Sequence, residues 1–489
     1  MKAWSPTTRL LFRSPVFRVP GLARVALMAC SFGCGSFWLA APVAAQGAPA
    51  QPDALPAPGS TPGQPRASAP EVSDPMLAPP PPAAKQIRSW DQGLQLVRAH
   101  APRYLAGVQR VRQAQARARI ALSGVLPVLS GEGTYRHEFL TENANMGGVV
   151  REAPLNDVFG ASATLRVPVV DVRALRGVGT GELGERAEQL GLADERGQIA
   201  VAVVDAMLST VAAARVAELN RTGLRSALER LQLASARQQF GRGTLLDVDR
   251  AQQDVAAARA ELIAGDEALQ QSYETLGLLL GSQTSVAVDR ALDLAAFDRA
   301  VAHSCKLARD VEERPDVAAA RARLQVAERL VDDAELLYLP TLDLVSQLKH
   351  ETKVNLGPET TWNLQGVLTV PLYDGGARYG AASEQRALTE QARQQLIETR
   401  LDALVAITRA TRAVAVTESA RAVARQQRDL ARSIDARIRS GYAGGLGTSL
   451  DLVTSAQSLR QAENRLAQLE LDVAKARAGA VLARAECMY

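Results

Sequence analysis

The sequence predicts an α+β membrane protein that is built as an internal duplication. Three observations support this fold class. The same series of motifs occurs twice, about 205 residues apart, each copy contains a very long segment without proline, and each contains two short segments of alternating apolar and polar residues. A duplicated unit of this kind means that the 489 residues should not be divided into three ordinary globular domains.

The duplicated motifs define the domain boundaries. We expect a first repeat over 89–285, an inter-repeat segment over 286–312 and a second repeat over 313–489. Each repeat reads as a strand hairpin, a long helix, a turn and a returning long helix. The first copy contains Leu126-Pro127, Val167-Pro168, Asp171, Gly241, Gly243, Thr244, Leu246 and Asp247, and the second contains Leu339-Pro340, Val370-Pro371, Asp374, Gly445, Gly447, Thr448, Leu450 and Asp451.

The N-terminal segment 1–45 has the pattern of a secretory signal peptide. Several arginines precede an apolar stretch over 25–41, and the small residues Val43-Ala44-Ala45 follow it. The alternative is a membrane-spanning anchor, although Gly33, Gly35 and Ser36 interrupt the apolar run. Residues 46–88 are rich in Pro, Ala, Gly and Ser, so we expect a flexible or extended arm that cannot bury enough apolar area to fold by itself.

Helices are expected wherever proline is absent over long stretches, because an internal proline removes a hydrogen bond and clashes with the preceding turn. A continuous helix over 172–240 would extend roughly 100 Å at 1.5 Å per residue. The returning helices show heptad spacing, as at Leu452, Leu459 and Leu466, which favours a coiled-coil seam over an ordinary helix bundle. The expected helices cover about 90–123, 172–240, 244–281, 313–337, 375–440 and 448–486.

Four strands are expected, at about 125–139, 159–170, 339–350 and 362–373. Their alternation gives each strand one polar and one apolar face, as expected for strands of a membrane β-barrel. Glu132, Arg136 and Arg166 lie on the polar face, which would line the water-filled lumen. Four strands cannot close around a pore, so the chain should oligomerise; a soluble sheet with one wet face is the alternative.

Other functions find little support in the sequence. The net charge of +4 and the 4% aromatic content argue against nucleic-acid binding. The stretch Gly179-Thr180-Gly181-Glu182-Leu183-Gly184 matches a dinucleotide fingerprint, but it begins a very long helix instead of a short crossover. His100, His137, His303 and His350 lack metal-ligand spacing, and no nucleophile motif is present, so we expect no cofactor and no enzyme activity.

On these motifs, from about Ser89 to Ala485, the chain resembles the TolC-like outer-membrane efflux proteins. The resemblance implies a homotrimer with a 12-stranded barrel in the bacterial outer membrane, four strands coming from each protomer. A periplasmic α-helical coiled-coil tunnel would continue from the barrel. It would dock onto a periplasmic adaptor protein and an inner-membrane transporter of the ABC or RND type.

The resemblance also implies roles for the turns between the long helices. They would form the periplasmic mouth, with Asp247, Asp249 and Asp451 near a constriction and Thr454 where the family has a second aspartate. The alternative for each aspartate is a charge that stabilises a helix start, with a threonine as the cap. The expected adaptor-docking residues are Arg242, Gly243, Thr244, Gly445, Gly447 and Thr448.

Two cysteines remain beyond the signal segment, Cys305 and Cys487. In the family's architecture the inter-repeat segment and the end of the last helix both lie near the middle of the tunnel. The resemblance therefore implies a Cys305–Cys487 disulfide in an oxidising periplasm, against two free buried thiols.

The function that the resemblance implies is an exit duct of a tripartite export system. The absence of a cysteine placed for lipid attachment favours ABC-driven type I protein secretion over RND-type drug efflux. An alternative of another class is a coiled-coil envelope scaffold that forms no channel.

Overall fold

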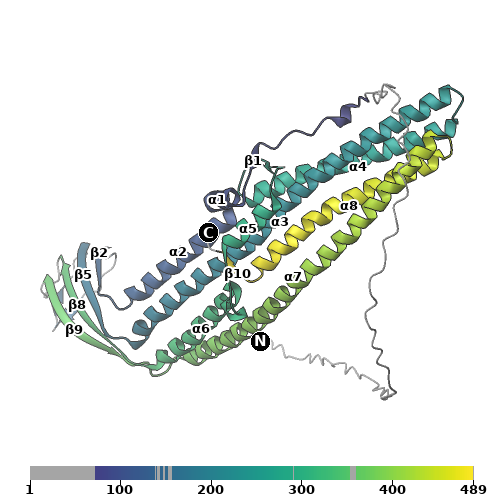
Figure 1. The fold of residues 1–489 in the computed structure, drawn as a ribbon. Coiled ribbons are helices and arrows are strands. Elements are labelled where there is room, and N and C mark those ends of the chain that lie inside the picture. The colour runs from purple at the N-terminus through teal and green to yellow at the C-terminus, as the bar shows by residue number, and fades with distance from the viewer. Residues whose placement is uncertain are drawn as a thin grey trace, which may run out of the picture. The chain divides into compact units, whose positions relative to one another are not determined.

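The computed structural model describes residues 72–137, 139, 144–146, 149–151, 157–289, 291–352 and 359–487 (Figure 1). The expected signal peptide and residues 46–71 of the expected arm lie outside these ranges. Residues 69–489 form one compact unit. Within it, the strands of one sheet lead directly into long helices that pair as hairpins.

The helices of the first repeat are α1 (Trp90–His100), α2 (Pro102–Ser123), α3 (Val172–Gln239) and α4 (Leu245–Leu279). The single helix expected over 90–123 is wrong, because the chain breaks before Pro102. The residue before a proline is disfavoured in the helical region, and Ala101 is extended. By contrast, the glycines at 177–184 do not interrupt α3, which runs for 68 residues.

The helices of the second repeat are α6 (Pro315–Glu335), α7 (Ala377–Ala443) and α8 (Ser449–Leu482), with a short turn η3 (Leu336–Tyr338) after α6. The last helix ends before the expected residue 486, because the chain becomes strand β10 (Ala485–Cys487). Helices α3 and α4 pack along each other, as do α7 and α8, and α3 also packs against α8 (Figure 1). The two hairpins therefore lie side by side.

Four strands form one antiparallel sheet in the order β2-β5-β8-β9. They are β2 (Val128–His137), β5 (Asp157–Val170), β8 (Thr341–Glu351) and β9 (Thr360–Thr369). The first begins three residues later than expected, because a turn that continues α2 occupies residues up to Leu126. A small hairpin of β3 (Ala144–Met146) and β4 (Val149–Arg151) lies between β2 and β5 in sequence.

The inter-repeat segment has structure of its own. It contains β6 (Val286–Val288), α5 (Leu294–His303), β7 (Cys305–Leu307) and η2 (Val311–Glu313). Strand β6 pairs with β1 (Lys85–Ile87), and β7 pairs with β10. The largest buried cluster gathers here, where Trp90 packs edge-on against Phe297 at 5.9 Å between ring centres. Apolar burial thus joins both repeats at the middle of the long helices.

The end of the expected arm is ordered, which corrects the expectation of a flexible segment up to residue 88. Residues 72–88 contain the short turn η1 (Pro75–Leu77) and strand β1, and they lie along α4 (Figure 1). Composition alone missed this because the apolar surface that orders the segment comes from α3 and α4, more than a hundred residues later.

Candidate functional site

The two faces of the four-stranded sheet differ in chemistry. Strand register puts Glu132 opposite Ser162, which in turn is opposite Lys349, so these side chains share one face. A hollow of about 450 Å³ on this face is lined mainly by polar groups, including Glu132, Arg136, Lys349 and Glu351. The predicted lumen residues Glu132 and Arg136 therefore lie together on the polar face.

Arg166 lies on the same polar face, nearer the helical end of the sheet. Its guanidinium forms an ion pair with the Asp343 carboxylate of the neighbouring strand β8. The Asp343 side chain is only 7% exposed, whereas Arg166 is 63% exposed. Arg166 thus covers a carboxylate that would otherwise be buried alone, a contact that the sequence did not suggest.

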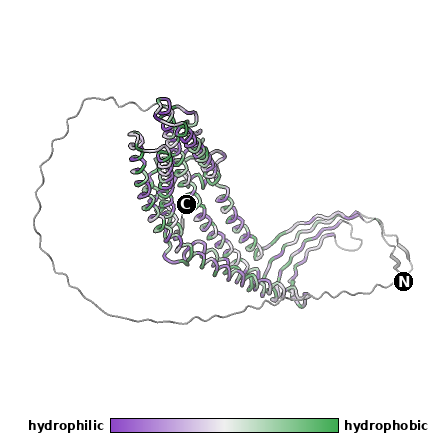
Figure 2. The backbone as a smooth tube through the Cα atoms, turned by 90° about the vertical axis from the view of Figure 1, so that its right-hand side faces the viewer, coloured by the Kyte–Doolittle hydropathy of each residue, from purple (hydrophilic) through white to green (hydrophobic). Residues whose placement is uncertain are grey.

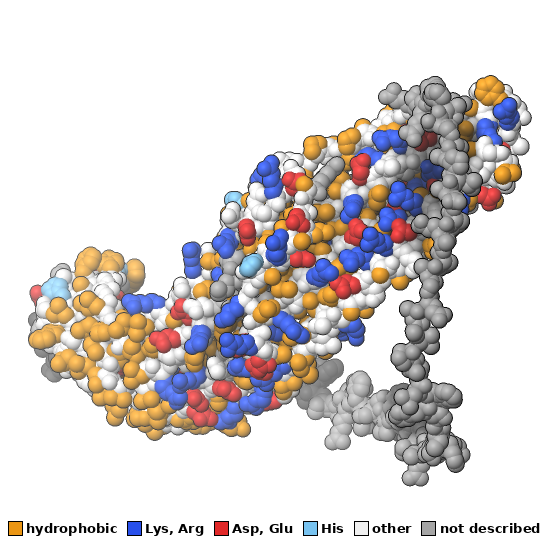
Figure 3. Space-filling view, viewed as in Figure 1, with side chains coloured by type: hydrophobic (Ala, Val, Ile, Leu, Met, Phe, Trp, Pro, Cys, Tyr) orange, Lys and Arg blue, Asp and Glu red, His pale blue; other side chains and the backbone are white. Residues whose placement is uncertain are grey.

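The opposite face of the sheet is apolar and open. Leu129, Leu165 and Leu364 occupy one row across the strands and are 74%, 39% and 62% exposed. Trp362, on the same face, is 75% exposed. In the space-filling view hydrophobic side chains gather over the sheet, while charged side chains of both signs cover the helices (Figure 3). Such a continuous apolar face needs a non-aqueous partner.

The two helical turns have the same backbone structure. Gly241 and Gly445 adopt positive φ values of 68° and 82°, which glycine accommodates without strain. The following residue donates back to the helix in each case, from Arg242 N to Arg237 O at 2.8 Å and from Leu446 N to Gly441 O at 2.9 Å. Both turns are therefore Schellman motifs, which end α3 and α7 by satisfying their last carbonyl groups.

Each turn then begins the returning helix with a capping box. Thr244 caps α4 and Thr448 caps α8, each accepting from the backbone N–H of the aspartate three residues later. The carboxylates of Asp247 and Asp451 accept in return from the threonine backbone N–H, at 2.9 and 3.4 Å. The alternative helix-start role of the two aspartates is thus present in the structure, and it satisfies otherwise unpaired donors.

The two turns differ in what touches the carboxylate. The Ser449 hydroxyl, at the start of α8, donates to the Asp247 carboxylate, and Arg250 Nη1 donates to Ser449 Oγ at 3.2 Å. The Ser449 hydrogen bond, followed by the Thr244 backbone N–H, holds the pKa of Asp247 below its ordinary value. The Asp451 carboxylate is exposed and bonds to Thr448 of its own turn. Asp247 thus joins the starts of α4 and α8.

A second contact joins the ends of α3 and α7 at the same level. The Arg237 guanidinium lies 4.3 Å from the centre of the Tyr442 ring, and its Nη1 donates to the Tyr442 carbonyl oxygen at 2.9 Å. Sequence reasoning missed Arg237, Arg250, Tyr442 and Ser449. The only available signal was their position beside the duplicated turns.

The other predicted mouth residues are exposed. Asp249 lies on the second turn of α4, and Thr454 lies on α8, where its hydroxyl donates to the Leu450 carbonyl oxygen at 2.9 Å. Arg242 and Leu446 are also exposed in the turns, and Leu446 is 92% exposed. Leu245, Leu246 and Leu450 are 67%, 54% and 49% exposed. The turns therefore present apolar side chains around a polar, capped backbone.

A buried ionic cluster lies further along the hairpins. The Asp254 side chain is fully buried and accepts from Arg230 Nη2 at 2.6 Å and from Arg460 Nη2 at 3.0 Å. Burial lowers the pKa of Arg230, although the Asp254 charge opposes this change. A Cβ atom at Gly223 would lie 2.5 Å from Arg460 Cδ, so this glycine leaves room for the arginine. Arg460 of α8 thus inserts between α3 and α4.

The predicted disulfide pair lies in the central region. Cys305 is disulfide-bonded, and the pairing of β7 with β10 puts Cys487 directly opposite it. Directly opposed residues of an antiparallel pair have Cα separations that suit a disulfide.

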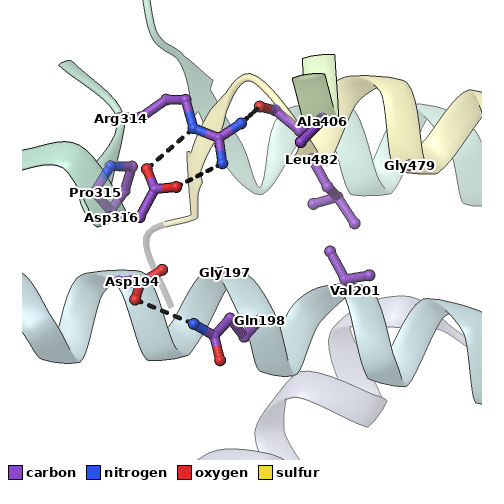
Figure 4. Close-up of a pocket in the computed structure, with 11 residues that line it drawn as sticks. Asp194, Gly197, Gln198, Val201, Arg314, Pro315, Asp316, Ala406, Gly479 and Leu482 are labelled. Atoms are coloured by element: carbon purple, nitrogen blue, oxygen red, sulfur yellow. Dashed lines mark hydrogen bonds and ion pairs between the residues drawn. The ribbon is translucent and has the colours of Figure 1, made fainter. Parts of the chain in front are cut away.

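A cavity of about 280 Å³ lies where α3, α6, α7 and α8 meet (Figure 4). Arg314 donates to both carboxylate oxygens of Asp316, at 3.0 and 2.8 Å, and also to the Ala483 carbonyl oxygen. Across the cavity, burial and the nearby Asp316 charge raise the pKa of Asp194, which accepts from Gln198 at 3.1 Å. The Arg314 contact with Ala483 links the start of α6 to the end of α8, whereas Asp194 and Gln198 bond to each other within α3. Across the described ranges, no group of three His, Cys, Asp or Glu side chains is arranged for a metal ion.

Comparison with known proteins agrees with this architecture. The chain is 27% identical over 407 residues to the pyoverdine export outer membrane protein OpmQ of Pseudomonas putida, covering 78% of this chain and 82% of that protein. It is 25% identical over 331 residues to the alkaline protease secretion protein AprF of Pseudomonas aeruginosa, covering 65% and 67%. Among solved structures, CusC superposes with a TM-score of 0.69 at 16% identity, covering 85% of this chain and 98% of that one.

The family model for outer membrane efflux protein matches residues 93–282 and 309–483, which includes both repeats and all four strands of the sheet. Proteins of this family are channels of the outer membrane, not enzymes, and extend into the periplasm. The chain belongs to the outer membrane efflux protein family.

Proposed function

We propose that this chain forms a homotrimeric exit duct that carries substrate from an inner-membrane transporter and a periplasmic adaptor to the cell exterior. The observation that carries the proposal is the sheet, which has one open apolar face and one polar face and leads into hairpins of about 100 Å.

Closure of the sheet supports the trimer. Strands β2 and β9 are the two edges of the sheet, and an open edge is not tolerated in the hydrocarbon region. Three copies would join edge to edge into twelve strands, with the apolar row of Leu129, Leu165 and Leu364 toward lipid. The polar face, with Glu132, Arg136 and Arg166, would then surround the water-filled lumen.

The periplasmic mouth is the other part of the proposal. Three copies of the exposed Asp451, together with Asp249 and Asp247, would concentrate cations at a constriction, and Thr454 would contribute no charge. The exposed leucines of the turns, with Arg242, Gly243, Thr244, Gly445, Gly447 and Thr448, would dock the tips of an adaptor. Apolar side chains around a rigid capped turn suit a helical-hairpin partner.

Planar-bilayer recording tests the duct. The purified protein should form water-filled, cation-selective pores, and the double variant Asp247→Asn, Asp451→Asn should shift the reversal potential toward zero in a salt gradient. A well-assembled trimer that never conducts would support the alternative of a coiled-coil envelope scaffold.

Two cargo classes are in competition. Type I protein secretion through an ABC transporter is favoured by AprF, which is named for secretion of a protease. Small-molecule efflux is favoured by OpmQ, named for pyoverdine export, and by FusA of Burkholderia cepacia, named for fusaric acid resistance and 25% identical over 296 residues. Deleting the gene and comparing secreted proteins with drug sensitivity separates them. A lost secreted protein with unchanged drug sensitivity supports the first class.

The proposed Cys305–Cys487 disulfide has a direct test. Intact-mass measurement of the unreduced protein, followed by reduction, should show a gain equal to two hydrogen atoms. An unreduced mass that already equals the dithiol form would remove the bridge.

A further inference from the structure

Residues 72–84, which we call the strap, follow α4 from the central region toward the helical turns. At its base, Lys85 N donates to Ser285 O at 3.2 Å, where β1 joins β6. Further along, Gln270 Nε2 donates to Pro81 O at 3.2 Å, and Arg259 Nη2 bonds to Asp74 Oδ2 at 2.7 Å. Asp74 contacts Arg259 and Pro81 contacts Gln270, so residue numbers rise in the same direction along the strap and along α4. The strap therefore runs parallel to the helix.

The strap covers an apolar cluster of the first hairpin. Val72, Met76 and Leu77 pack against it, the last two from the short turn η1. The cluster consists of Leu224, Ala227, Leu228, Val255, Ala258 and Leu262, each no more than 9% exposed. The seated strap therefore covers this apolar cluster from outside, and we call the covered face of the first hairpin the groove.

A single ion pair anchors the far end of the strap. The Asp74 side chain is only 6% exposed, and its carboxylate also accepts from Met76 N at 2.9 Å. The Arg259 hydrogen bond, and then the Met76 hydrogen bond, hold the pKa of Asp74 below its ordinary value. A buried carboxylate with two partners specifies one position for the strap on the groove.

The prolines suit this segment to its place. Residues 79–82 are consecutive prolines, which favour an extended chain and lack backbone N–H groups that would need partners. Less conformational entropy is lost when such a segment is ordered against a surface.

The second hairpin provides an internal comparison. Of the six cluster positions, those of Leu224 and Leu228 correspond to Arg428 and Arg432, and Arg259 corresponds to Glu463. The four other cluster positions are apolar in both hairpins, being Ala431, Leu459, Ala462 and Leu466 in the second. Charged side chains thus replace two of the six apolar cluster residues and the arginine that holds Asp74. Of the two hairpins, the first therefore combines an uninterrupted apolar cluster with an arginine that bonds Asp74.

We propose that the strap is a built-in cover that closes the flank of the first hairpin to partner helices, so that the second hairpin offers the open flank. The cover follows from the contacts of residues 72–84, whereas the identity of the excluded partner, a helical adaptor, rests on the proposed function. The two hairpins of one protomer would then be unequal docking surfaces despite their duplicated turns.

Thiol labelling measures whether the groove is covered. The reporter Leu228→Cys should react slowly with a maleimide while the strap is seated, because a buried thiol must wait for local opening. Adding Met76→Asp and Leu77→Asp should raise its labelling rate by about tenfold or more. The matched control Arg432→Cys, at the equivalent position of the second hairpin, should label fast with or without the strap substitutions.

A second measurement tests whether the groove, once released from the strap, binds the same segment added as a peptide. A synthetic peptide of residues 72–84 should slow the labelling of Leu228→Cys in the strap variant and leave Arg432→Cys unchanged. If that variant does not assemble, Asp74→Asn provides a milder release, for which an increase in labelling rate is again expected.

The proposal is overturned if Leu228→Cys labels as fast as Arg432→Cys in the otherwise unchanged protein, or if releasing the strap leaves its rate the same. It is also overturned if the peptide protects both reporters equally. Labelling does not depend on conductance. A protein that forms no pore but shows the expected labelling rates would therefore contradict the proposed exit duct and still support the strap as a cover of the first hairpin.

Discussion

The two repeats share their turns and differ in nearly everything that touches them. Both turns end one helix with a left-handed glycine and begin the next with a Thr–Asp capping box. Asp247 is held by Ser449 across the hairpins, whereas Asp451 bonds within its own turn and is exposed. A repeated local sequence thus reproduces a backbone, while each carboxylate takes its properties from its neighbours.

The same contrast extends along the hairpins. The first hairpin contains the buried Asp254 between two arginines, and the equivalent position of the second is the exposed Ser458. The first hairpin also carries the strap, whereas the second has arginine at two of the equivalent cluster positions. Along the helices of both hairpins hydrophilic and hydrophobic residues are interspersed (Figure 2). The first hairpin therefore supplies the buried acid and the surface for the strap, while the second hairpin contributes Arg460 to the same acid.

The largest effect is expected from removing the buried acid. Asp254→Ala leaves Arg230 and Arg460 buried without their shared partner, which should destabilise the protein by about 3–5 kcal/mol. The matched change Ser458→Ala in the second hairpin should stay within about 0.5 kcal/mol. Thermal unfolding of the purified protein measures both changes, and equal losses of stability would show that the two hairpins do not differ in this way.

The sheet should respond equally in both repeats. Leu165 and Leu364 lie in one row across the strands, so Leu165→Arg and Leu364→Arg should each cost about 2–4 kcal/mol if that row is near the bilayer midplane. Thr164→Arg, on the polar face, is the control and should assemble normally. Heat-modifiable trimers in outer-membrane fractions report assembly, and normal assembly of both leucine variants would contradict the lipid-facing row.

Substitutions in the two turns should differ in whether they mainly reduce stability or mainly reduce cation selectivity. Asp247→Asn weakens a capping box and the Ser449 contact, so it should cost roughly 1 kcal/mol, more than Asp451→Asn. Asp451→Asn should instead cause the larger loss of cation selectivity, because its carboxylate is exposed. Urea unfolding ranks the two variants by loss of stability, and reversal potentials rank them by loss of cation selectivity. If the same variant shows the larger loss in both measurements, the prediction is wrong.

The contribution of the Asp247 carboxylate to stability should be lost only at strongly acidic pH. Because its folded-state pKa lies below the ordinary value of 3.8, the contribution is fully present above that value and is lost as the pH falls through the folded-state pKa. The stability difference between the parent and Asp247→Asn should therefore be constant from pH 7 to about pH 5 and shrink only below about pH 4. A difference that already shrinks near pH 6 would exclude this assignment.

The smallest effect on stability is expected at Thr454. Its side chain is exposed and bonds to its own helix, so Thr454→Asp should change stability by no more than about 0.5 kcal/mol. It should nevertheless increase cation selectivity if α8 lines the constriction. Asp249→Asn is the comparison on α4, and an unchanged reversal potential in both would remove these positions from the pore.

Local patterns predicted a large part of the fold. Proline-free stretches predicted the long helices, and period-two alternation predicted which face of the sheet is polar, since both depend on residues close in sequence. The predictions were wrong where a residue close in sequence was overlooked, or where a contact with a distant segment decided the local structure. Pro102 breaks the first helix by its own geometry, whereas β10 replaces the end of the last helix because β7 pairs with it.

The sequence by itself determined the duplication, the turn structures and the amphipathic strands, because glycine, threonine, aspartate and alternating side chains act through their immediate neighbours. Only the tertiary structure decided that Ser449 binds Asp247, that Asp343 lies under Arg166 and that residues 72–84 cover the first hairpin. Each of these contacts joins residues more than a hundred positions apart. Their formation depends on how helices and strands pack, which no local pattern specifies.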